Sequence, residues 1–490
     1  MKFSLPMKLP LRFRILAWLG ALIASQLLHL APAWAEELPQ LGDSTSAVVS
    51  PEQEYRLGRA WLRQLRAQAP IIQDPLVHEY FYNLVYRLAA NSEIQRPDLE
   101  TIVINSPEIN AFAVPGGVIG LNGGLLLNAR TEDEVAGVIA HELAHLSQRH
   151  FARSLERSQN TSWAGLAALL ASVVIAATAG GDAGMAALAT TQAASIESQL
   201  RFSRGNEQEA DRIGMQTLAR SGMNPGAMAD FFEALQRSMR YSGEIPPEFL
   251  LTHPVTESRI TDARARAAQL PAAPSSNSLE FALMKVRLSV LFARDSSATI
   301  NDLLTQRKNS SEFVEVNEYG LTCAYAKANQ LDEALTTVDG LLKRRPERIT
   351  YIATKAEILN QSGRYKDAIK LLESALKYNP DNYVLTIHYT NALIKSKRAN
   401  DAVDLLRYQL TQHESWPLLW SMLAEAYGKS DDRLGVYQAR AEYYFLYGRT
   451  MTALEQLQYA LPLAEKQFQV AAKINTRMDE MRASEMDMKL

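Results

Sequence analysis

The second half of the chain repeats with a period of 34 residues, and this period constrains the fold more than any other feature. Pro346 and Pro380 lie 34 residues apart, and aligning them brings Ala334, Ala368 and Ala402 into register. A unit of this length holds two helices and the turns between them. Small side chains at matching positions let the two helices approach closely. We therefore expect an all-α array in which each helical pair packs on its neighbours.

One unit of the array carries a fuller signature. Residues 349–382 place Ala356, Gly363 and Pro380 where a tetratricopeptide repeat has its packing, turn and terminating residues. The C-terminal part of the chain therefore resembles a tetratricopeptide-repeat domain, which we assign to residues 281–490. The resemblance implies a solenoid whose concave surface binds protein.

The first 35 residues have the pattern of a secretory signal. Lysines and arginines precede an apolar stretch, and Ala33-Trp34-Ala35 supplies small residues for cleavage. Polar residues interrupt the apolar stretch, which favours a cleaved signal over a membrane anchor. We expect cleavage after Ala35 and export to a bacterial periplasm. The single cysteine, Cys323, suits an oxidising compartment, where free thiols are a liability.

Charge and composition limit the partners and the domain organisation. Lys and Arg total 51 and Asp and Glu total 54, a formal net charge of −3, so no nucleic-acid partner is expected. The stretch 271–280 lies in a segment rich in Pro, Ala and Ser, which predicts a linker. We predict a mainly helical domain with a small β element over residues 36–270, followed by this linker and the all-α repeat domain.

The strongest chemical signal is the pentapeptide HELAH at residues 141–145. A capping pattern at 131–134 predicts that a helix begins shortly before it. On a helix, His141 and His145 are one turn apart and face the same way, so both imidazoles can reach one zinc ion. Glu142 lies beside them and can accept a proton from water that the metal activates. The alternative is a pair of buried histidines with ordinary hydrogen bonds.

A catalytic zinc site needs a third protein ligand. The segment 203–225 offers Glu207 and Asp211, one helical turn apart. One carboxylate can bind the metal while the other accepts the free ring N–H of a ligand histidine and fixes its tautomer. Glu209 is the rival ligand, but it points away from the face of Asp211, so we prefer Glu207. The alternative is a solvated acidic helix start.

Together these motifs resemble a known peptidase family. The HExxH motif at 141–145, the sequence NEQEAD at 206–211 and the glycine-rich stretch 110–125 are similar to those of the zinc peptidase family that contains the CaaX-prenyl protease and the HtpX heat-shock protease. The resemblance implies an α+β catalytic domain with a zincin-type HExxH helix. The membrane-embedded members are a poor guide to membrane topology, because this sequence lacks their set of long transmembrane helices.

The same resemblance implies a role for each motif residue. His141, His145 and Glu207 are then the ligands of one zinc ion per chain. Glu142 is the general base, and Asp211 stands behind a ligand histidine. The implied activity is that of a zinc metalloendopeptidase.

The resemblance, together with the export signal and the repeat domain, also implies a biological role. It implies a periplasmic enzyme that degrades misassembled outer-membrane β-barrel proteins and has a chaperone-like role in their assembly. The repeat domain would bind these unfolded proteins or the outer-membrane assembly machinery. The rival hypothesis is a non-proteolytic repeat chaperone or scaffold with a latent or structural zinc site. Glu142 favours the enzyme, since a structural site has no use for a general base.

Two further candidates lie in one segment, Thr252–Arg259. His253 precedes a proline, which favours an extended conformation outside a helix. It either approaches the zinc, fills the position of the water and makes the site latent, or it is an ordinary loop histidine. Arg259 either stabilises the oxyanion of a tetrahedral intermediate or is a helix-surface arginine. We include His253 among the metal ligands and Arg259 among the catalytic residues.

Two other stretches have structural interpretations. Residues 116–124 are glycine-rich but lack the ending of a phosphate-binding loop, and we predict instead an edge strand, Val118 to Leu121, that can hold an extended substrate.

Residues 163–179 are almost wholly apolar. They form either a buried helical hairpin or a lid or hairpin in peripheral contact with a membrane, and a true span is disfavoured because both flanks must return to one site.

The remaining histidines and the cysteine are assigned no chemistry. His150 lies nine residues after His141 and on a different helix face, so we expect an ordinary helix histidine. His78, His388 and His413 have no partners in the sequence. Cys323 is expected to be a small buried packing residue.

Overall fold

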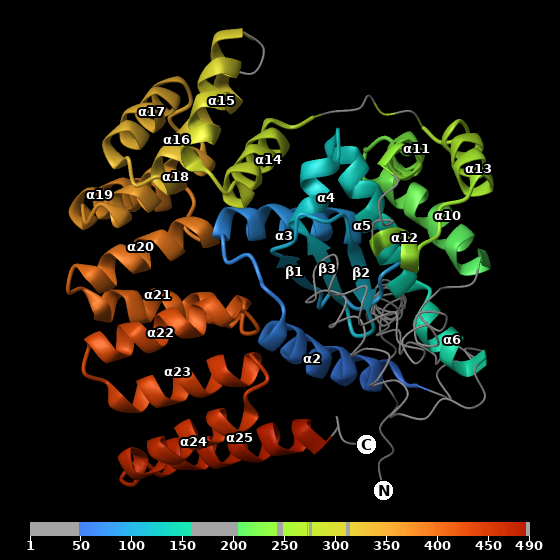
Figure 1. Ribbon diagram of the computed structural model, residues 1–490. Coiled ribbons are helices and arrows are strands. Elements are labelled where there is room, and N and C mark those ends of the chain that lie inside the picture. Colours follow the sequence, from blue (N-terminus) through green and yellow to red (C-terminus); the bar gives the residue numbers. More distant parts are fainter. Residues whose placement is uncertain are drawn as a thin grey trace, which may run out of the picture. The chain divides into compact units, whose positions relative to one another are not determined.

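The computed structural model describes residues 49–157, 204–242, 248–271, 273, 277–309 and 314–486 (Figure 1). It is mainly helical, with one small sheet in the N-terminal part and a long series of helices after it, which confirms the predicted fold class. The predicted signal peptide and the apolar stretch 163–179 lie outside the described residues. Among the helices that are described, none is long and apolar enough to cross a membrane.

Two capped helices open the described chain. The side chain of Ser50 accepts the backbone N–H of Gln53 at the start of α2 (Pro51–Gln68). Asp74 accepts two backbone N–H groups at the start of α3 (Pro75–Ala89). Both helices begin with proline, whose fixed φ angle suits the first helical position. The buried face of α3 packs on the helix that carries the HExxH motif and on the first strand of the sheet.

Three short strands form the sheet, β1 (Glu100–Ile104), β2 (Ala111–Val114) and β3 (Val118–Asn122). The order is β1-β3-β2, with β3 parallel to β1 and antiparallel to β2. The strand predicted at Val118 to Leu121 is present, but its predicted edge position is wrong, because β3 is the central strand and is buried along its length. Local glycine content cannot reveal a parallel partner that precedes it in the chain. The edge on this side of the sheet belongs to β2.

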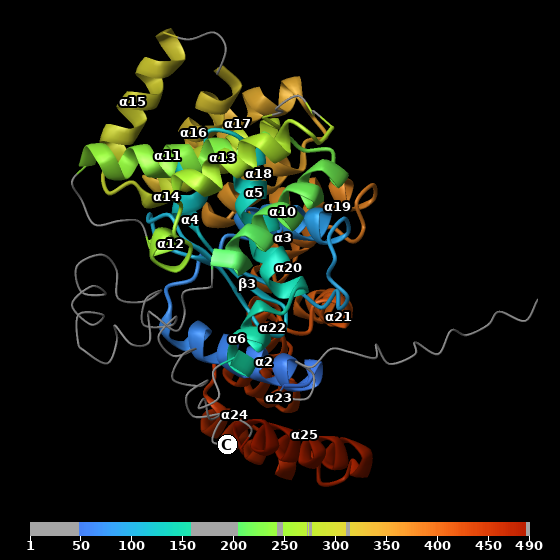
Figure 2. The same cartoon turned by 90° about the vertical axis from the view of Figure 1, so that its right-hand side faces the viewer.

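The HExxH helix α5 (Glu132–Ser147) begins where the sequence predicts. The hydroxyl of Thr131 accepts the N–H of Glu134 at 3.2 Å. The capping box is only half formed, since the Glu134 carboxylate accepts hydrogen bonds from Arg130 instead. Almost every residue of α5 is buried, because the helix packs against β2, α3, α10 (Arg204–Arg220) and α11 (Gly226–Ser242). Figure 2 shows α5 and α10 side by side. The other helices of this region are α4 (Gly123–Asn128), α6 (His150–Arg157), α12 (Glu248–Thr252) and α13 (Glu257–Ala267).

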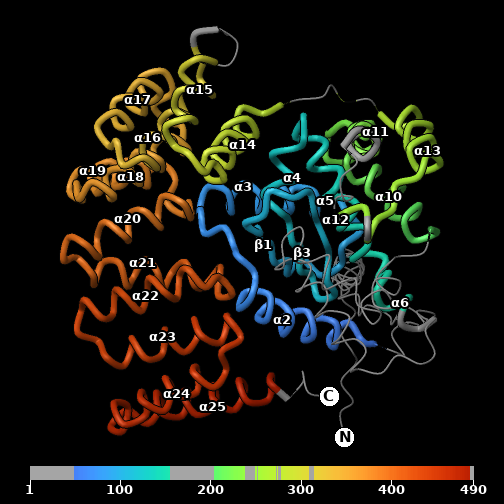
Figure 3. The backbone as a smooth tube through the Cα atoms, in the orientation of Figure 1, coloured from blue at the N-terminus to red at the C-terminus, as the bar shows by residue number. Residues whose placement is uncertain are grey.

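The rest of the described chain is a series of helical hairpins, visible as successive turns of the tube in Figure 3. Ala334, Ala368 and Ala402, which the 34-residue period aligns, are all fully buried between paired helices. Gly363 turns the chain with φ +73°, a left-handed value that favours glycine. The helices are α14 (Leu279–Phe292), α15 (Ser296–Asn309), α16 (Val314–Lys327), α17 (Leu331–Arg344), α18 (Ile349–Gln361), α19 (Tyr365–Leu376), α20 (Tyr383–Lys395), α21 (Ala399–Gln412), α22 (Pro417–Lys429), α23 (Arg433–Leu446), α24 (Thr450–Ala460) and α25 (Phe468–Met486), with a 3-10 turn at Leu461–Ala464.

Polar contacts join the repeat array to the sheet region. Arg287 of α14 is buried and donates to Asp74, the N-cap of α3, and to Glu357 of α18. Ser415, just before α22, donates to Glu100 of β1. One continuous apolar core also runs from α3 and α5 into the repeat helices. The two regions therefore pack against each other, although the predicted linker lies between them in the sequence.

Candidate metal centre and active site

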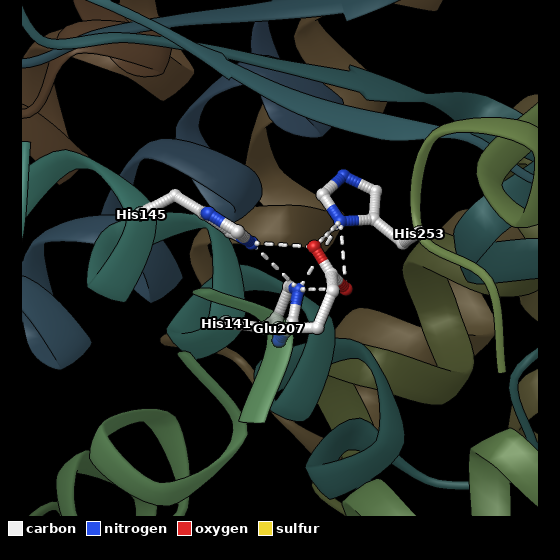
Figure 4. A group of neighbouring side chains, drawn as sticks. All are labelled: His141, His145, Glu207 and His253. Carbon is white, nitrogen blue, oxygen red and sulfur yellow. Dashed lines mark hydrogen bonds and ion pairs between the residues drawn. The ribbon is translucent and has the colours of Figure 1, made fainter. Parts of the chain in front are cut away.

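Helix α5 places the two motif histidines together. His141 and His145 are buried, and their Nε2 atoms lie 3.0 Å apart. The one-turn spacing on a helix accounts for this, because side chains four residues apart lie one above the other on the same face. Figure 4 shows both rings directed toward the same point.

Helix α10 supplies the carboxylate. Glu207 is buried, with one oxygen 3.4 Å from His145 Nε2 and the other 3.5 Å from His141 Nε2. Glu209, the rival ligand in the sequence, lies elsewhere and contacts His150 and Arg153. Of the two carboxylates, the structure therefore brings only Glu207 to the histidine pair.

A fourth donor comes from the turn after α12. His253 is buried, and its Nδ1 lies 3.3 Å from His141 Nε2 and 3.1 Å from Glu207 Oε1. Its backbone N–H donates to Phe249, whose ring stacks on the imidazole with a centroid distance of 4.9 Å. Of the two alternatives for this residue, the structure favours the one that brings it into the cluster (Figure 4).

The four side chains fit a divalent metal ion. Three imidazoles and a carboxylate each offer one ligand atom, and these atoms all lie within 4.8 Å of one another. Contacts between them run from 3.0 to 3.5 Å. Ligands about 2.0–2.1 Å from a tetrahedral zinc ion would stand roughly 3.3 Å apart. His141 Nδ1 lies beside the Asp211 carboxylate, which favours a proton there, so Nε2, which faces the other donors, is the nitrogen that would bind a metal ion.

Glu142 lies at the edge of this cluster. Its buried carboxylate accepts the backbone N–H of Ala113 on β2 and stands 3.4 Å from His253 Nε2. Burial raises the pKa of Glu142, and its Oε1 has no hydrogen-bond partner among the described residues. A raised pKa and a position beside the clustered donors suit a group that takes up a proton during a reaction.

Asp211 and Arg259 stand behind the cluster. Asp211 Oδ1 lies 3.0 Å from His141 Nδ1, the ring nitrogen that faces away from the other donors. Arg259 donates to both oxygens of Asp211 at 2.8 and 2.7 Å, and its Nη1 lies 2.8 Å from Glu207. Burial would raise the pKa of Asp211, but the contacts with His141 and Arg259 outweigh it and lower the pKa.

The position of Arg259 differs from both alternatives drawn from the sequence. The side chain is buried, so it is no surface arginine. Every guanidinium nitrogen contacts Asp211, Glu207 or the carbonyl of Pro254, which leaves no nitrogen facing a substrate. Arg259 therefore holds the two carboxylates in place, and an oxyanion role does not fit this geometry. The sequence could not show this, because the two carboxylate partners lie 48 or more residues away.

Burial and neighbouring charges shift the pKa values of the clustered side chains in different directions. Burial alone would lower the pKa of His141, but Asp211 and Glu207 outweigh it and raise the pKa to about 9. Burial lowers the pKa of His145 well below its usual value, and the nearby carboxylate does not compensate. Burial would raise the pKa of Glu207, yet the histidines around it hold the pKa well below its usual range. The carboxylate is thus ionised and available as a ligand.

One site neighbour was missed in the sequence. His150 is buried, and its Nδ1 lies 2.8 Å from His145 Nδ1. The nine-residue spacing separates His150 from the face of His141 only if one continuous helix carries both residues. Helix α5 ends at Ser147, Arg149 adopts a left-handed φ of 49°, and α6 begins at His150 in a new direction. Only a sequence signal for the end of a helix within residues 147–150 could have revealed this contact.

Comparison with known families agrees with this geometry. A model described as peptidase family M48 matches residues 75–267, and a tetratricopeptide-repeat model matches residues 359–426. The first range contains all of the clustered side chains. The chain is therefore a metalloprotease, in keeping with a donor set that suits a divalent metal.

Several curated proteins match nearly the whole chain. The beta-barrel assembly-enhancing protease of Escherichia coli strain K12 is 35% identical over 463 residues, which cover 93% of each chain. The putative beta-barrel assembly-enhancing protease of Vibrio cholerae is 35% identical over 447 residues, 91% of this chain and 92% of its own. The mitochondrial metalloendopeptidase OMA1 of Arabidopsis thaliana is 34% identical over 171 residues, 35% of this chain and 32% of its own. The chain thus belongs to the M48 metallopeptidases and, among them, to the family of the beta-barrel assembly-enhancing proteases.

Proposed function

We propose that the chain is a periplasmic zinc-dependent endopeptidase. One observation carries the proposal: a buried carboxylate, Glu142, faces a cluster of three histidines and one glutamate. A purely structural metal site has no use for an extra buried carboxylate beside its ligands. We assign His141, His145 and Glu207 as zinc ligands, within a peptidase domain over residues 36–270 that precedes the repeat domain.

The side chains divide the chemistry among them. A bound zinc ion lowers the pKa of water and polarises a peptide carbonyl. Glu142 takes the proton of the attacking water and delivers it to the leaving amide nitrogen. Its raised pKa favours this exchange, since a more basic carboxylate accepts a proton more readily. Asp211 fixes the tautomer of His141, and Arg259 keeps Asp211 and Glu207 oriented.

Strand β2 gives the substrate a place to bind. It pairs with β3 on one side only and is an edge strand of the described sheet. Its hydrogen bonds to β3 alternate along the strand, so the backbone groups of Ala111 and Ala113 point to the free edge. The Ala113 N–H already meets Glu142 there. An extended peptide added to this edge would pass beside the catalytic carboxylate.

The substrates follow from the relatives and the repeat array. Relatives that match more than nine-tenths of this chain, and of their own length, are named for enhancing β-barrel assembly. We propose that this chain acts in the same process, cleaving misassembled outer-membrane β-barrel proteins and supporting their assembly. Its repeat array, with helical pairs stacked along residues 279–486, offers the surface that binds these clients or the assembly machinery.

The cluster has a fourth donor, and this supports a latent resting state. His253 occupies the side of the cluster next to Glu142, where the attacking water must stand. With His253 in this position, four protein side chains would hold a bound zinc ion and leave no open site, as in closed structural centres. We propose that His253 must leave before substrate is cut. A non-proteolytic scaffold would keep the same closed geometry permanently.

Proteolysis of an unfolded protein by the purified chain tests the proposal. Glu142→Gln should lower the rate by about 10²- to 10⁴-fold, the usual contribution of a general base, and should keep its zinc. Glu132→Gln is the matched control, because Glu132 is also buried on α5 but contacts Tyr80 and Ser278 instead. Equal cleavage by both variants would contradict the role of Glu142. If neither the wild type nor the two variants cut while all hold zinc, the site is either latent or that of a scaffold. Cleavage by His253→Ala would then show a latent enzyme, and its absence would support the scaffold hypothesis.

A further inference from the structure

The ligand histidine His145 has a chain of side chains behind it. Its Nδ1, the ring nitrogen that faces away from the cluster, lies 2.8 Å from Nδ1 of His150. The other nitrogen of His150 lies 3.1 Å from Glu209, and Arg153 donates to the same Glu209 oxygen at 2.9 Å. His150 is fully buried, whereas Glu209 and Arg153 are partly exposed.

One arrangement of protons satisfies the whole chain. When Nε2 of His145 directs its lone pair into the cluster, its proton is on Nδ1 and is donated to Nδ1 of His150. His150 then carries its own proton on Nε2 and donates it to the Glu209 carboxylate. Each hydrogen bond fixes the next, because a neutral imidazole has one donor and one acceptor nitrogen.

The arrangement parallels the support of the other motif histidine. His141 meets Asp211 directly, and Asp211 is held by Arg259. His145 meets a carboxylate through one additional imidazole, and that carboxylate is again held by an arginine. In both cases the carboxylate behind the motif histidine comes from α10, where Glu209 and Asp211 lie two residues apart.

We propose that His150 and Glu209 are positioning residues for the metal ligand His145, a role that rests on the proposed function. His150 sets the tautomer and ring orientation of His145, and Glu209 sets the tautomer of His150. Glu209, considered first as a rival ligand, thereby serves the same centre without touching the metal. Arg153 keeps the Glu209 carboxylate turned toward His150. Partners of this kind commonly affect metal affinity by about 10- to 100-fold.

Zinc affinity of the purified full chain, measured by competition with a chromophoric chelator, tests this inference. His150→Leu fills the space but removes the acceptor, and zinc should bind at least about tenfold more weakly. His150→Asn places its Oδ1 where Nδ1 stands, so it should restore most of the affinity. Glu209→Ala should weaken zinc binding less than His150→Leu, while Glu209→Gln keeps an acceptor and should stay near the wild type.

The controls separate positioning from folding. His388→Leu removes another buried histidine, in α20 of the repeat array, and should leave zinc affinity unchanged. Thermal unfolding of the metal-free variants reports any loss of structure by itself. If His150→Leu binds zinc as tightly as the wild type, or if His150→Asn is as weak as His150→Leu, the positioning role is wrong. If the wild type itself binds no zinc, the proposed function fails as well.

Discussion

The metal centre brings together side chains that lie far apart in the chain, whereas the repeat array packs helices that follow one another. His141 and His253 are 112 residues apart and 3.3 Å from each other. In the array, α18, α19, α20 and α21 each pack mainly on the helix before and the helix after. A change in the array should therefore act locally on stability, while a change in the centre should act on chemistry with the fold preserved.

The largest expected effect is on the stability of the array. Leu372 of α19 is fully buried, and Leu372→Ala leaves a cavity that should lower the free energy of unfolding by about 2–5 kcal/mol. Urea unfolding measures this loss, and metal analysis checks that the metal content is unchanged. Leu463→Ala is the control, since Leu463 is 39% exposed and its truncation should lower the free energy of unfolding little. A clear loss of metal in Leu372→Ala would show that the two regions are not independent.

The next effect tests the centre alone. His253→Ala opens the side of the cluster next to Glu142, so peptide cleavage should rise by on the order of tenfold if about 1.4 kcal/mol is needed to displace the side chain. Steady-state cleavage of an unfolded substrate gives the rate, and urea unfolding should show little change beyond the lost packing on Phe249. A large fall in activity with the metal retained would instead place His253 in the chemistry.

Sequence periodicity could predict the parts that repeat or lie on one helix. The 34-residue period located Ala334, Ala368 and Ala402, and helical spacing brought His141 next to His145. The same geometry chose Glu207 over Glu209, because the two carboxylates point to different faces of α10.

The parts that depend on chain reversals could not be predicted. His150 was missed because the left-handed turn at Arg149 redirects the chain. Strand β3 was placed at an edge because its parallel pairing with β1 joins segments separated by another strand. Arg259 was assigned to a surface or to the substrate because its carboxylate partners on α10 are distant in sequence. In each case a tertiary contact, and not a local propensity, decides the role.

The smallest effect lies where the two regions meet. Glu79 of α3 accepts a hydrogen bond from Asn382 of the repeat array at 3.2 Å. Burial and the nearby Glu280 raise the pKa of Glu79 to about 7, although the bond from Asn382 opposes them. Because the folded chain prefers the protonated acid, its stability is full below the ordinary pKa of about 4.5 and falls as the pH rises toward 7.

Glu79→Gln removes this titration and should reduce the fall in stability between pH 4.5 and pH 7. The free energy of unfolding of the variant should equal that of the wild type at pH 4.5 and exceed it at pH 8 by about 1 kcal/mol. This figure is smaller than the full pKa shift would give, because Glu79 is only partly buried. Urea unfolding followed by tryptophan fluorescence measures the free energy of unfolding, and one of the fluorophores, Trp416, lies at the junction with its ring centroid 4.6 Å from that of His78, on the same helix as Glu79. Glu347→Gln, on an exposed turn of the array, is the control and should leave the pH profile unchanged.

If both variants lose stability with rising pH as the wild type does, the charge at the junction does not couple the two regions. Their connection would then depend on the continuous apolar core and on Arg287, whose bonds to Asp74 and Glu357 cross the same boundary.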